Sequence, residues 1–231
     1  MRIAIDQPNY MPSGEYLRKM ASVDLFVFLN NVQFEKNGFQ NRNRVRNSES
    51  RQWITVPVTY HFPSKICDIE VDFTHNWQKD HMHTLDACYG SAPFYKQYAP
   101  LFAEFFCAPA SKIDRIAIDS VRLLSGILGI TTDSVYSSDY KFKDDKTARL
   151  INICRHFKAT TYVALSTEKD HTNAPLMKEA GIDVEFLDAA PIVYSQHWAK
   201  SESEFIPGLS AIDLIFNCGN RSLDVLTGIG S

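Results

Sequence analysis

The chain has 231 residues, 45% of them hydrophobic and 22% charged, and its formal net charge at pH 7 is −3. This length suits one α/β domain, and the composition supplies enough apolar material to exclude a disordered chain. Because Lys and Arg are spread along the sequence and are outnumbered by Asp and Glu, we expect no nucleic-acid partner. Neither a signal peptide nor a membrane-spanning stretch is visible, and the five cysteines are widely spaced, which is typical of a reduced, cytoplasmic protein.

The first thirty residues predict a strand, a loop, a helix and a second strand. Residues 2–6 form a short apolar run, residues 15–22 are amphipathic, and residues 24–29 are again apolar. Parallel strands joined by a helix place the carboxyl end of the first strand at the mouth of a crevice where α/β proteins bind ligands. The loop at residues 6–10 is therefore expected to lie at a binding site.

The rest of the chain predicts a helical middle followed by renewed alternation. Residues 30–47 are polar, residues 53–58 favour a strand, and residues 66–71 are expected to pair with it. Residues 77–129 turn helical, with helices expected at 77–89, 98–106 and 112–128, and are a candidate insert. Strands at 133–136, 161–165 and 184–186 are then expected to alternate with helices at 146–157 and 174–180, and a short apolar helix capped by Ser210 follows at 209–216. The predicted fold class is α/β, with a Rossmann-like, mostly parallel sheet flanked by helices and a helical middle segment.

Two groups of polar side chains follow the first two predicted strands. Asp6, Gln7, Asn9 and Tyr10 surround Pro8 in the first loop, where prolines stiffen the chain before a ligand arrives. Carboxamides suit a sugar, amide or purine edge, and Asn30, Asn31 and Gln33 offer them after the second strand. The alternatives are an Asx-turn with Tyr10 packed in the core, and a plain Asn-Asn turn.

Arg42, Asn43 and Arg44, with Arg46 close behind, form the densest basic segment. The arginine fork binds phosphate or carboxylate in a bidentate manner, so the segment fits a nucleotide-sugar pyrophosphate or a carrier protein's phosphopantetheine. A solvated charged face is the competing interpretation.

A predicted helix carries Trp77, His81 and Tyr89 at spacings that allow one shared face. A histidine there is a candidate general base, because its free pKa is close to neutral. His81 and His83 point apart on a helix and no HExxH or CxxC motif is present, so no metal site is expected. A catalytic cysteine is not expected either, and with neither a Walker loop nor GxGxxG, the cofactor stays undetermined.

Several motifs, in order along nearly the whole chain, resemble the WbqC-like family of proteins from bacterial surface-polysaccharide (O-antigen) and secondary-metabolite gene clusters. The motifs are Ile5-Asp-Gln-Pro-Asn-Tyr-Met-Pro12, the segment 21–34 ending in Asn-Asn-Val-Gln-Phe, Gln40-Asn-Arg-Asn-Arg44, Trp53-Ile-Thr-Val-Pro57, and the late segment 209–219. Carried over to this sequence, the family's polar positions fall on Gln7, Pro8, Asn31, Gln33, Arg42, Asn43, Arg44, Trp77, Tyr89 and Asp213.

The chain departs from the family pattern at two places near the predicted site. Asp6 stands where relatives usually have His or Met, and Asn30-Asn31 stands where they often have two aspartates. The first departure changes any general-base role at that position, and the second removes two charges from the second strand's end.

The resemblance implies transfer of an acyl or aminoacyl group from an activated donor to the amine of a sugar or small metabolite. We expect Asp6 or His81 to take the proton, the residues of the first loop with Asn31 and Gln33 to bind the acceptor, and Arg42 and Arg44 to bind the donor. The expected partners are a small-molecule substrate and an acyl or aminoacyl carrier protein. A non-catalytic binding module for a nucleotide sugar or carrier protein, or an adenylate-forming enzyme, is the alternative.

Overall fold

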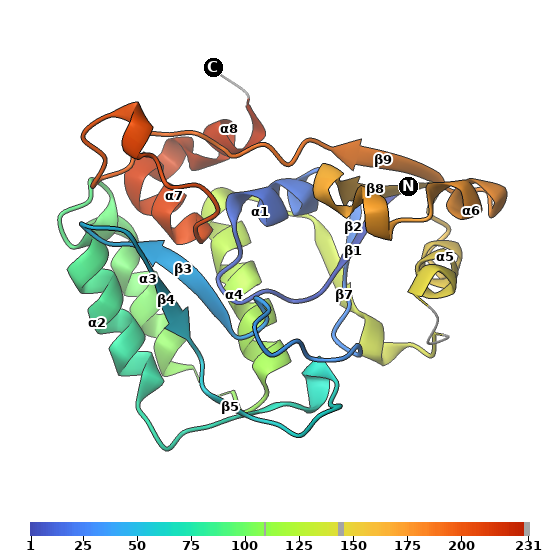
Figure 1. Ribbon diagram of the computed structural model, residues 1–231, viewed down its shortest axis with the longest axis horizontal. Helices are drawn as coiled ribbons and strands as arrows, with labels where there is room; N and C mark the ends of the chain where they lie inside the picture. The colour runs from blue at the N-terminus through green and yellow to red at the C-terminus, as the bar shows by residue number, and fades with distance from the viewer. Residues whose placement is uncertain (109, 143–145, 229–231) are drawn as a thin grey trace.

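A computed structural model of the chain describes residues 1–108, 110–142 and 146–228, and a five-stranded parallel sheet is its central feature (Figure 1). The strands lie side by side in the order β7 (Asp133–Tyr136), β2 (Leu25–Phe28), β1 (Arg2–Asp6), β8 (Thr161–Leu165) and β9 (Asp183–Leu187). Every neighbouring pair is parallel. The predicted Rossmann-like α/β fold is therefore confirmed.

The strand order reverses at β1. The chain passes from β1 to β2 and β7 on one side, and β8 and β9 are added on the other side. Such a reversal opens a crevice outside the carboxyl ends of the two central strands, which is where doubly wound α/β proteins bind ligands. Here that point lies between the ends of β1 and β8.

Alternating residues of the strands pack on opposite faces of the sheet. Ala4 and Phe26 belong to a core shared with α1 (Gly14–Ala21), α4 (Ile113–Leu128) and α7 (Ala211–Cys218). Ile3 and Val27 belong to a second core with α5 (Lys146–His156) and α6 (Ala174–Glu179). Figure 1 shows these two sets of helices on either side of the sheet, as expected when side chains alternate along a strand.

The helical middle is confirmed as three consecutive helices. They are α2 (Trp77–Tyr89), α3 (Tyr95–Cys107) and α4. Helices α2 and α3 lie at the end of the molecule opposite α5 and α6, and α4 lies between them and the sheet (Figure 1). Helix α4 ends at Gly129, whose φ of 75° is left-handed and suits glycine.

Two short antiparallel pairs complete the strands: β3 (Arg42–Arg46) with β4 (Arg51–Thr55), and β5 (Val58–Thr59) with β6 (Glu70–Val71). The predicted strand at residues 53–58 is therefore divided, because Pro57 lacks the N–H that a continuous ladder requires. The polar composition of residues 30–47 concealed β3.

The remaining helices are short. Ser210 caps α7, as predicted, by accepting a hydrogen bond from the Ile212 N–H, and α8 (Ser222–Thr227) follows α7. Single 3-10 turns occur at Ile66–Asp68, Ser137–Asp139, Ser166–His171, Glu202–Glu204 and Gly219–Arg221.

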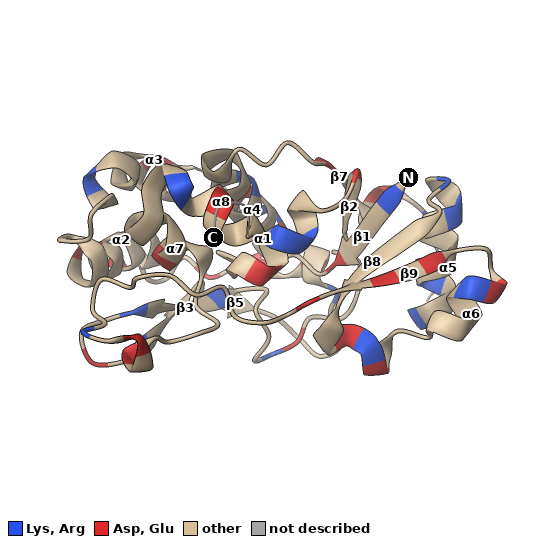
Figure 2. Ribbon diagram, turned by 90° about the horizontal axis from the view of Figure 1, so that it is seen from above, with Lys and Arg blue, Asp and Glu red and all other residues tan. Residues whose placement is uncertain are grey.

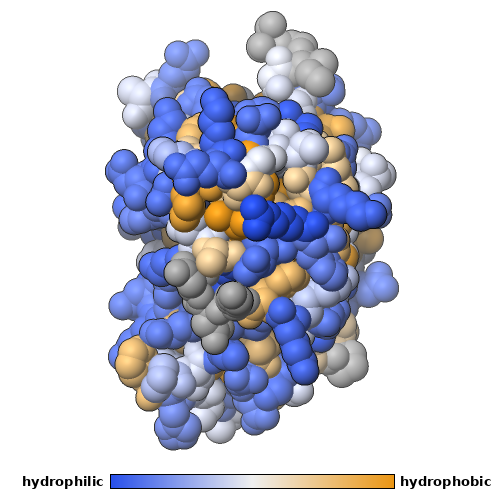
Figure 3. Space-filling view, turned by 90° about the vertical axis from the view of Figure 1, so that its right-hand side faces the viewer, coloured by the Kyte–Doolittle hydropathy of each residue, from blue (hydrophilic) through white to orange (hydrophobic). Residues whose placement is uncertain are grey.

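The helices, one face of the surface and the cysteines bear on what the composition predicts. No helix in the described part of the chain combines the length and apolarity needed to cross a membrane. The end of the molecule that carries α5 and α6 is mostly hydrophilic, with small apolar areas (Figure 3). All five cysteines are free thiols, and Cys88, Cys154 and Cys218 are buried.

Candidate functional site

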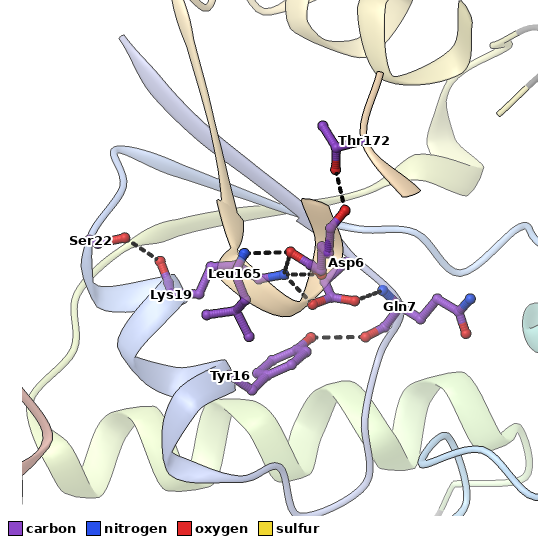
Figure 4. Close-up of polar contacts among 8 residues, drawn as sticks. Asp6, Gln7, Tyr16, Lys19, Ser22, Leu165 and Thr172 are labelled. Carbon is purple, nitrogen blue, oxygen red and sulfur yellow. Dashed lines mark hydrogen bonds and ion pairs between the residues drawn. The ribbon is translucent and has the colours of Figure 1, made fainter. Parts of the chain in front are cut away.

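A buried lysine joins two carboxylates at the point where the strand order reverses. Lys19 lies on α1, its side chain is 0% exposed, and its Nζ donates hydrogen bonds to Asp6 at the end of β1 and to Glu168 after β8 (Figure 4). The Nζ–Oε1 distance to Glu168 is 2.9 Å. Three separate segments therefore meet in one ionic group at the carboxyl ends of β1 and β8.

The protonation state of Lys19 determines the net charge of this ionic group. Burial by itself lowers the pKa of Lys19, but the charges of Asp6 and Glu168 and their hydrogen bonds more than offset it, so the pKa is raised. Lys19 therefore stays an ammonium and is no free nucleophile. One cation between two carboxylates leaves a net negative charge, and these carboxylate side chains are 23% and 29% exposed.

Neighbouring hydrogen bonds fix the two carboxylates in place. Asp6 Oδ1 accepts from the N–H of Gln7 at 2.8 Å, and Glu168 Oε2 accepts from the N–H of Leu165 at 2.6 Å. The Tyr16 hydroxyl donates to the Gln7 carbonyl at 3.1 Å, which ties the first loop to α1 (Figure 4). The carboxylates are thus ordered before a ligand arrives, which reduces the entropy lost on binding.

Carboxamides extend the polar group along the first loop. The Gln7 side chain accepts a hydrogen bond from the side-chain amide of Gln40, which precedes β3. Asn9 is half-buried, and its side chain makes no hydrogen bond within the described residues. Free amide donors and acceptors beside a carboxylate suit a ligand with hydroxyl or amino groups.

The end of β2 adds a second polar group beside the first. The N–H of Leu29 donates to the Asp6 carbonyl at 2.7 Å, so the residues after β2 start next to Asp6. Asn31 accepts from the Ser137 hydroxyl at 2.7 Å and donates to the Ser137 carbonyl at 3.2 Å. Gln33 is exposed and forms an isolated bridge with Lys65. Asn31 therefore lies on the same edge of the sheet as Asp6, but its side chain is already hydrogen-bonded to Ser137, the first residue after β7.

The three sequence-predicted residues of β3 point to two different faces of the hairpin. Asn43 is 2% exposed, and its amide donates to the carbonyls of Met11 at 2.8 Å and Tyr10 at 3.2 Å. Arg42 and Arg44 face outward, where both guanidinium groups lie over the Trp53 ring. Asn43 thus supports the first loop, whereas the arginines form a separate surface.

His81 lies in the core rather than beside the ionic group of Asp6, Lys19 and Glu168. It is 5% exposed, its Nε2 is 3.2 Å from the Thr55 carbonyl, and its Nδ1 is 2.8 Å from the Tyr10 hydroxyl. A carbonyl only accepts, so Nε2 carries the proton and Nδ1 accepts from Tyr10. Burial lowers the pKa of His81 to about 4, so the ring is neutral at pH 7 with both nitrogens engaged. The structure does not bring His81 to Asp6.

Trp77 and Tyr89 are also core residues. The Trp77 ring packs edge-on against His81 with centroids 5.2 Å apart. The Tyr89 hydroxyl donates to Asp213 at 2.9 Å and accepts from the N–H of Arg46 at the same distance. Asp213 is 0% exposed and also accepts from Tyr194 at 2.8 Å. These contacts join α2, α7 and β3 through buried polar groups.

Two residues of the ionic group, Lys19 and Glu168, were not predicted from the sequence. Lys19 carries a detectable signal, since it lies three residues after Tyr16 and one before Met20, on the apolar side of an amphipathic helix. Glu168 follows a strand by three residues and carries no comparable signal.

The comparisons with known proteins identify a family. The sequence profile of the WbqC-like protein family matches residues 7–225. An uncharacterised protein of Mycobacterium tuberculosis, Rv1507c, is 33% identical, and the match covers 97% of this chain and 97% of that protein. No solved structure matches the chain significantly. The match spans Gln7, Lys19 and Glu168 of the site, and this chain belongs to the WbqC-like protein family.

Proposed function

We propose that this protein transfers an acyl or aminoacyl group from an activated donor to the amino group of a sugar or small metabolite, in surface-polysaccharide or secondary-metabolite biosynthesis. In this reaction the amine nitrogen attacks the donor's carbonyl carbon, a C–N bond forms, and the bond to the leaving group breaks. The attacking amine must lose a proton, which Asp6 accepts and then passes to the leaving group. The biosynthetic setting rests on the family resemblance alone.

The ionic group at the strand reversal carries this proposal. Asp6 is a partly exposed carboxylate at the expected mouth of the crevice, and buried Lys19 holds it in one orientation. A net negative group attracts an ammonium-bearing acceptor, and a fixed carboxylate provides general-base catalysis when the acceptor's proton is within hydrogen-bond reach. Gln7 and Asn9 supply further polar contacts for a hydroxyl-rich acceptor.

His81 has a weaker claim to the base role than Asp6. It is 5% exposed and both of its ring nitrogens are hydrogen-bonded in the core, so an acceptor amine cannot reach it. Arg42 and Arg44 remain the residues that bind the anionic part of the donor, as expected from the sequence. Both lie on the surface of the β3–β4 hairpin and are only partly buried, so a donor can reach them.

An amine-acylation assay with purified protein tests the proposal, using acyl and aminoacyl thioesters as donors and amino sugars as acceptors. We expect turnover by the wild type, a fall in kcat of about 10²–10⁴-fold in Asp6→Asn, and a raised KM for the donor in Arg42→Ala. Asp119→Asn is the matched control, because Asp119 is an exposed carboxylate in an ion pair with Arg122 on α4.

Two outcomes contradict the proposal. Full activity in Asp6→Asn removes Asp6 from the chemistry, and a simultaneous loss in His81→Asn returns the base role to His81. Saturable ligand binding by the wild type without turnover on any donor supports a non-catalytic binding module instead.

A further inference from the structure

The outward face of the β3–β4 hairpin concentrates positive charge. The antiparallel register places Arg44 opposite Trp53 and Arg46 opposite Arg51, with Arg42 two residues away on the same side. Arg46 is 4% exposed, and the Gln196 side chain and the Glu204 carbonyl accept its hydrogen bonds. Arg42, Arg44 and Arg51 therefore form the accessible basic part of this face, and basic positions along β3 are visible in Figure 2.

Within the described part of the chain, no carboxylate forms an ion pair with the arginines of this face. The ion pairs among residues 1–108, 110–142 and 146–228 do not include Arg42, Arg44, Arg46 or Arg51. Burial and the nearby charge of Arg51 lower the pKa of Arg44. Like charges held together without a counter-charge are unfavourable, so an external anionic group would relieve the repulsion.

Exposed aromatic rings lie among the arginines. Trp53 is 43% exposed and Phe39 is 37% exposed, and their ring centroids are 5.9 Å apart. The Arg42 guanidinium lies 4.2 Å from the Trp53 centroid and donates to the Asn37 carbonyl at 2.7 Å, which holds it in place. Arginine and aromatic residues are enriched at protein interfaces and at their energetic centres, particularly where side chains are ordered in advance.

The shape of this face fits a broad partner better than a small ligand. Three hollows in the described part of the chain lie away from this face, and the most voluminous of the three, an open one of about 720 Å³, is lined by α2, α3 and the segment before α2. None of them is lined by Phe39, Trp53 or the hairpin arginines. Small-molecule sites are normally concave, whereas protein partners use flatter surfaces.

We propose that this arginine–aromatic face, formed by Phe39, Arg42, Arg44, Arg51 and Trp53, docks an acidic segment of a partner protein. Its carboxylates pair with the arginines while apolar side chains cover the two rings. The net charge of −3 for the whole chain opposes a long polyanion such as RNA and permits a short acidic segment. This inference deepens the proposed function, because such a partner would carry the donor group, yet docking requires nothing of Asp6.

Fluorescence anisotropy tests the docking with a labelled peptide rich in Glu and Leu, compared with the same peptide carrying Gln in place of Glu. We expect saturable binding of the acidic peptide only, weakened at least about tenfold by Arg51→Glu and by Trp53→Thr, and reduced by added salt. Both positions are on the surface, so the fold is retained. Arg155→Glu, an exposed arginine on α5, is the matched control and leaves binding unchanged.

Competition and a second variant give the outcomes that overturn the inference. Three outcomes each refute an acidic protein partner: equal binding of both peptides, an equal loss of binding in Arg155→Glu, or binding of uridine diphosphate, pyrophosphate or a short single-stranded RNA without binding of the acidic peptide. Failure of the docking and failure of the proposed chemistry give different results. If the chemistry alone is wrong, Asp6→Asn still binds the acidic peptide. If the docking alone is wrong, the wild type turns over free thioesters but does not bind the peptide.

Discussion

Lys19 determines the electrostatics of the candidate site at the scale of a single residue. Its ammonium is fully buried and pairs with two carboxylates that reach solvent. Removing one partner of a buried ion pair leaves uncompensated charge, which destabilises a fold more than the pair itself stabilises it. Asp6 and Glu168 would then face each other without a cation.

Lys19→Met is expected to lower the free energy of unfolding by about 3 kcal/mol. This loss is at the lower end of the range for breaking a buried ion pair, because both carboxylates are partly hydrated. Urea unfolding at pH 7 measures it. Lys112→Met is the control, because Lys112 forms an exposed pair with Glu70, which is 70% exposed, and it should change stability by less than about 1 kcal/mol. Equal effects of the two substitutions would contradict a special role for Lys19.

The raised pKa of Lys19 determines how its contribution to the stability of the fold changes with pH. Because the folded protein holds the proton more tightly, the contribution of Lys19 is fully present below the ordinary lysine pKa of 10.5 and declines as the pH rises above it. The wild type should therefore lose stability above pH 10.5 more steeply than Lys19→Met. Unfolding midpoints on both sides of pH 10.5 provide the comparison.

His81 should make the fold less stable as the pH falls, whereas Lys19 makes it less stable as the pH rises. Its pKa falls from 6.5 to about 4 on folding, so the unfolded chain takes up the proton first as the pH drops. Stability should fall between pH 6.5 and 4, by at most about 3 kcal/mol from this residue. The loss should be smaller in His81→Asn, measured as urea midpoints at pH 7, 6 and 5. Parallel curves for the two proteins would show that His81 is not buried as a neutral ring.

The β1–α1 loop depends on an element that the sequence did not reveal. Met11 has a φ of 44°, a left-handed conformation that is unfavourable for methionine, and neighbouring elements hold it there. The Ser120 hydroxyl of α4 accepts from its N–H at 2.8 Å, and Asn43 of β3 donates to its carbonyl. The first loop is therefore ordered from two sides.

Asn43→Ala should lower the free energy of unfolding by about 1–3 kcal/mol, because it leaves buried carbonyls without donors. It should also increase amide hydrogen exchange in residues 7–11, since the loop loses its hydrogen bonds from β3. Ser50→Ala, at an exposed position in the adjoining hairpin turn, is the control. Unchanged exchange in residues 7–11 would show that β3 does not order the loop.

At the scale of the whole molecule, the regular periodic elements could be predicted from the sequence. The strands at residues 2–6, 133–136 and 161–165, and the helix at 77–89, have the expected bounds. Short apolar runs indicate strands such as β1 and β8, which are buried on both faces, and helical apolar spacing indicates the one buried face of α2. β3 escaped prediction because its inward residues include Asn43, whose burial depends on a distant loop. Lys19 and Glu168 meet only after β1, α1 and β8 have packed, so local pattern cannot show their contact.

Ligand-induced stabilisation tests the central claim that a small acceptor binds at Asp6 between β1 and β8. Thermal shift of the intact protein with a panel of amino sugars and amines measures it, since a ligand at ~100 times its Kd adds about 2.7 kcal/mol. We expect a rise in Tm for an amino-bearing ligand with the wild type and with His81→Asn, and none with Asp6→Asn. An equal rise with Asp6→Asn, or no rise with any ligand, would contradict the placement of the acceptor at this edge of the sheet.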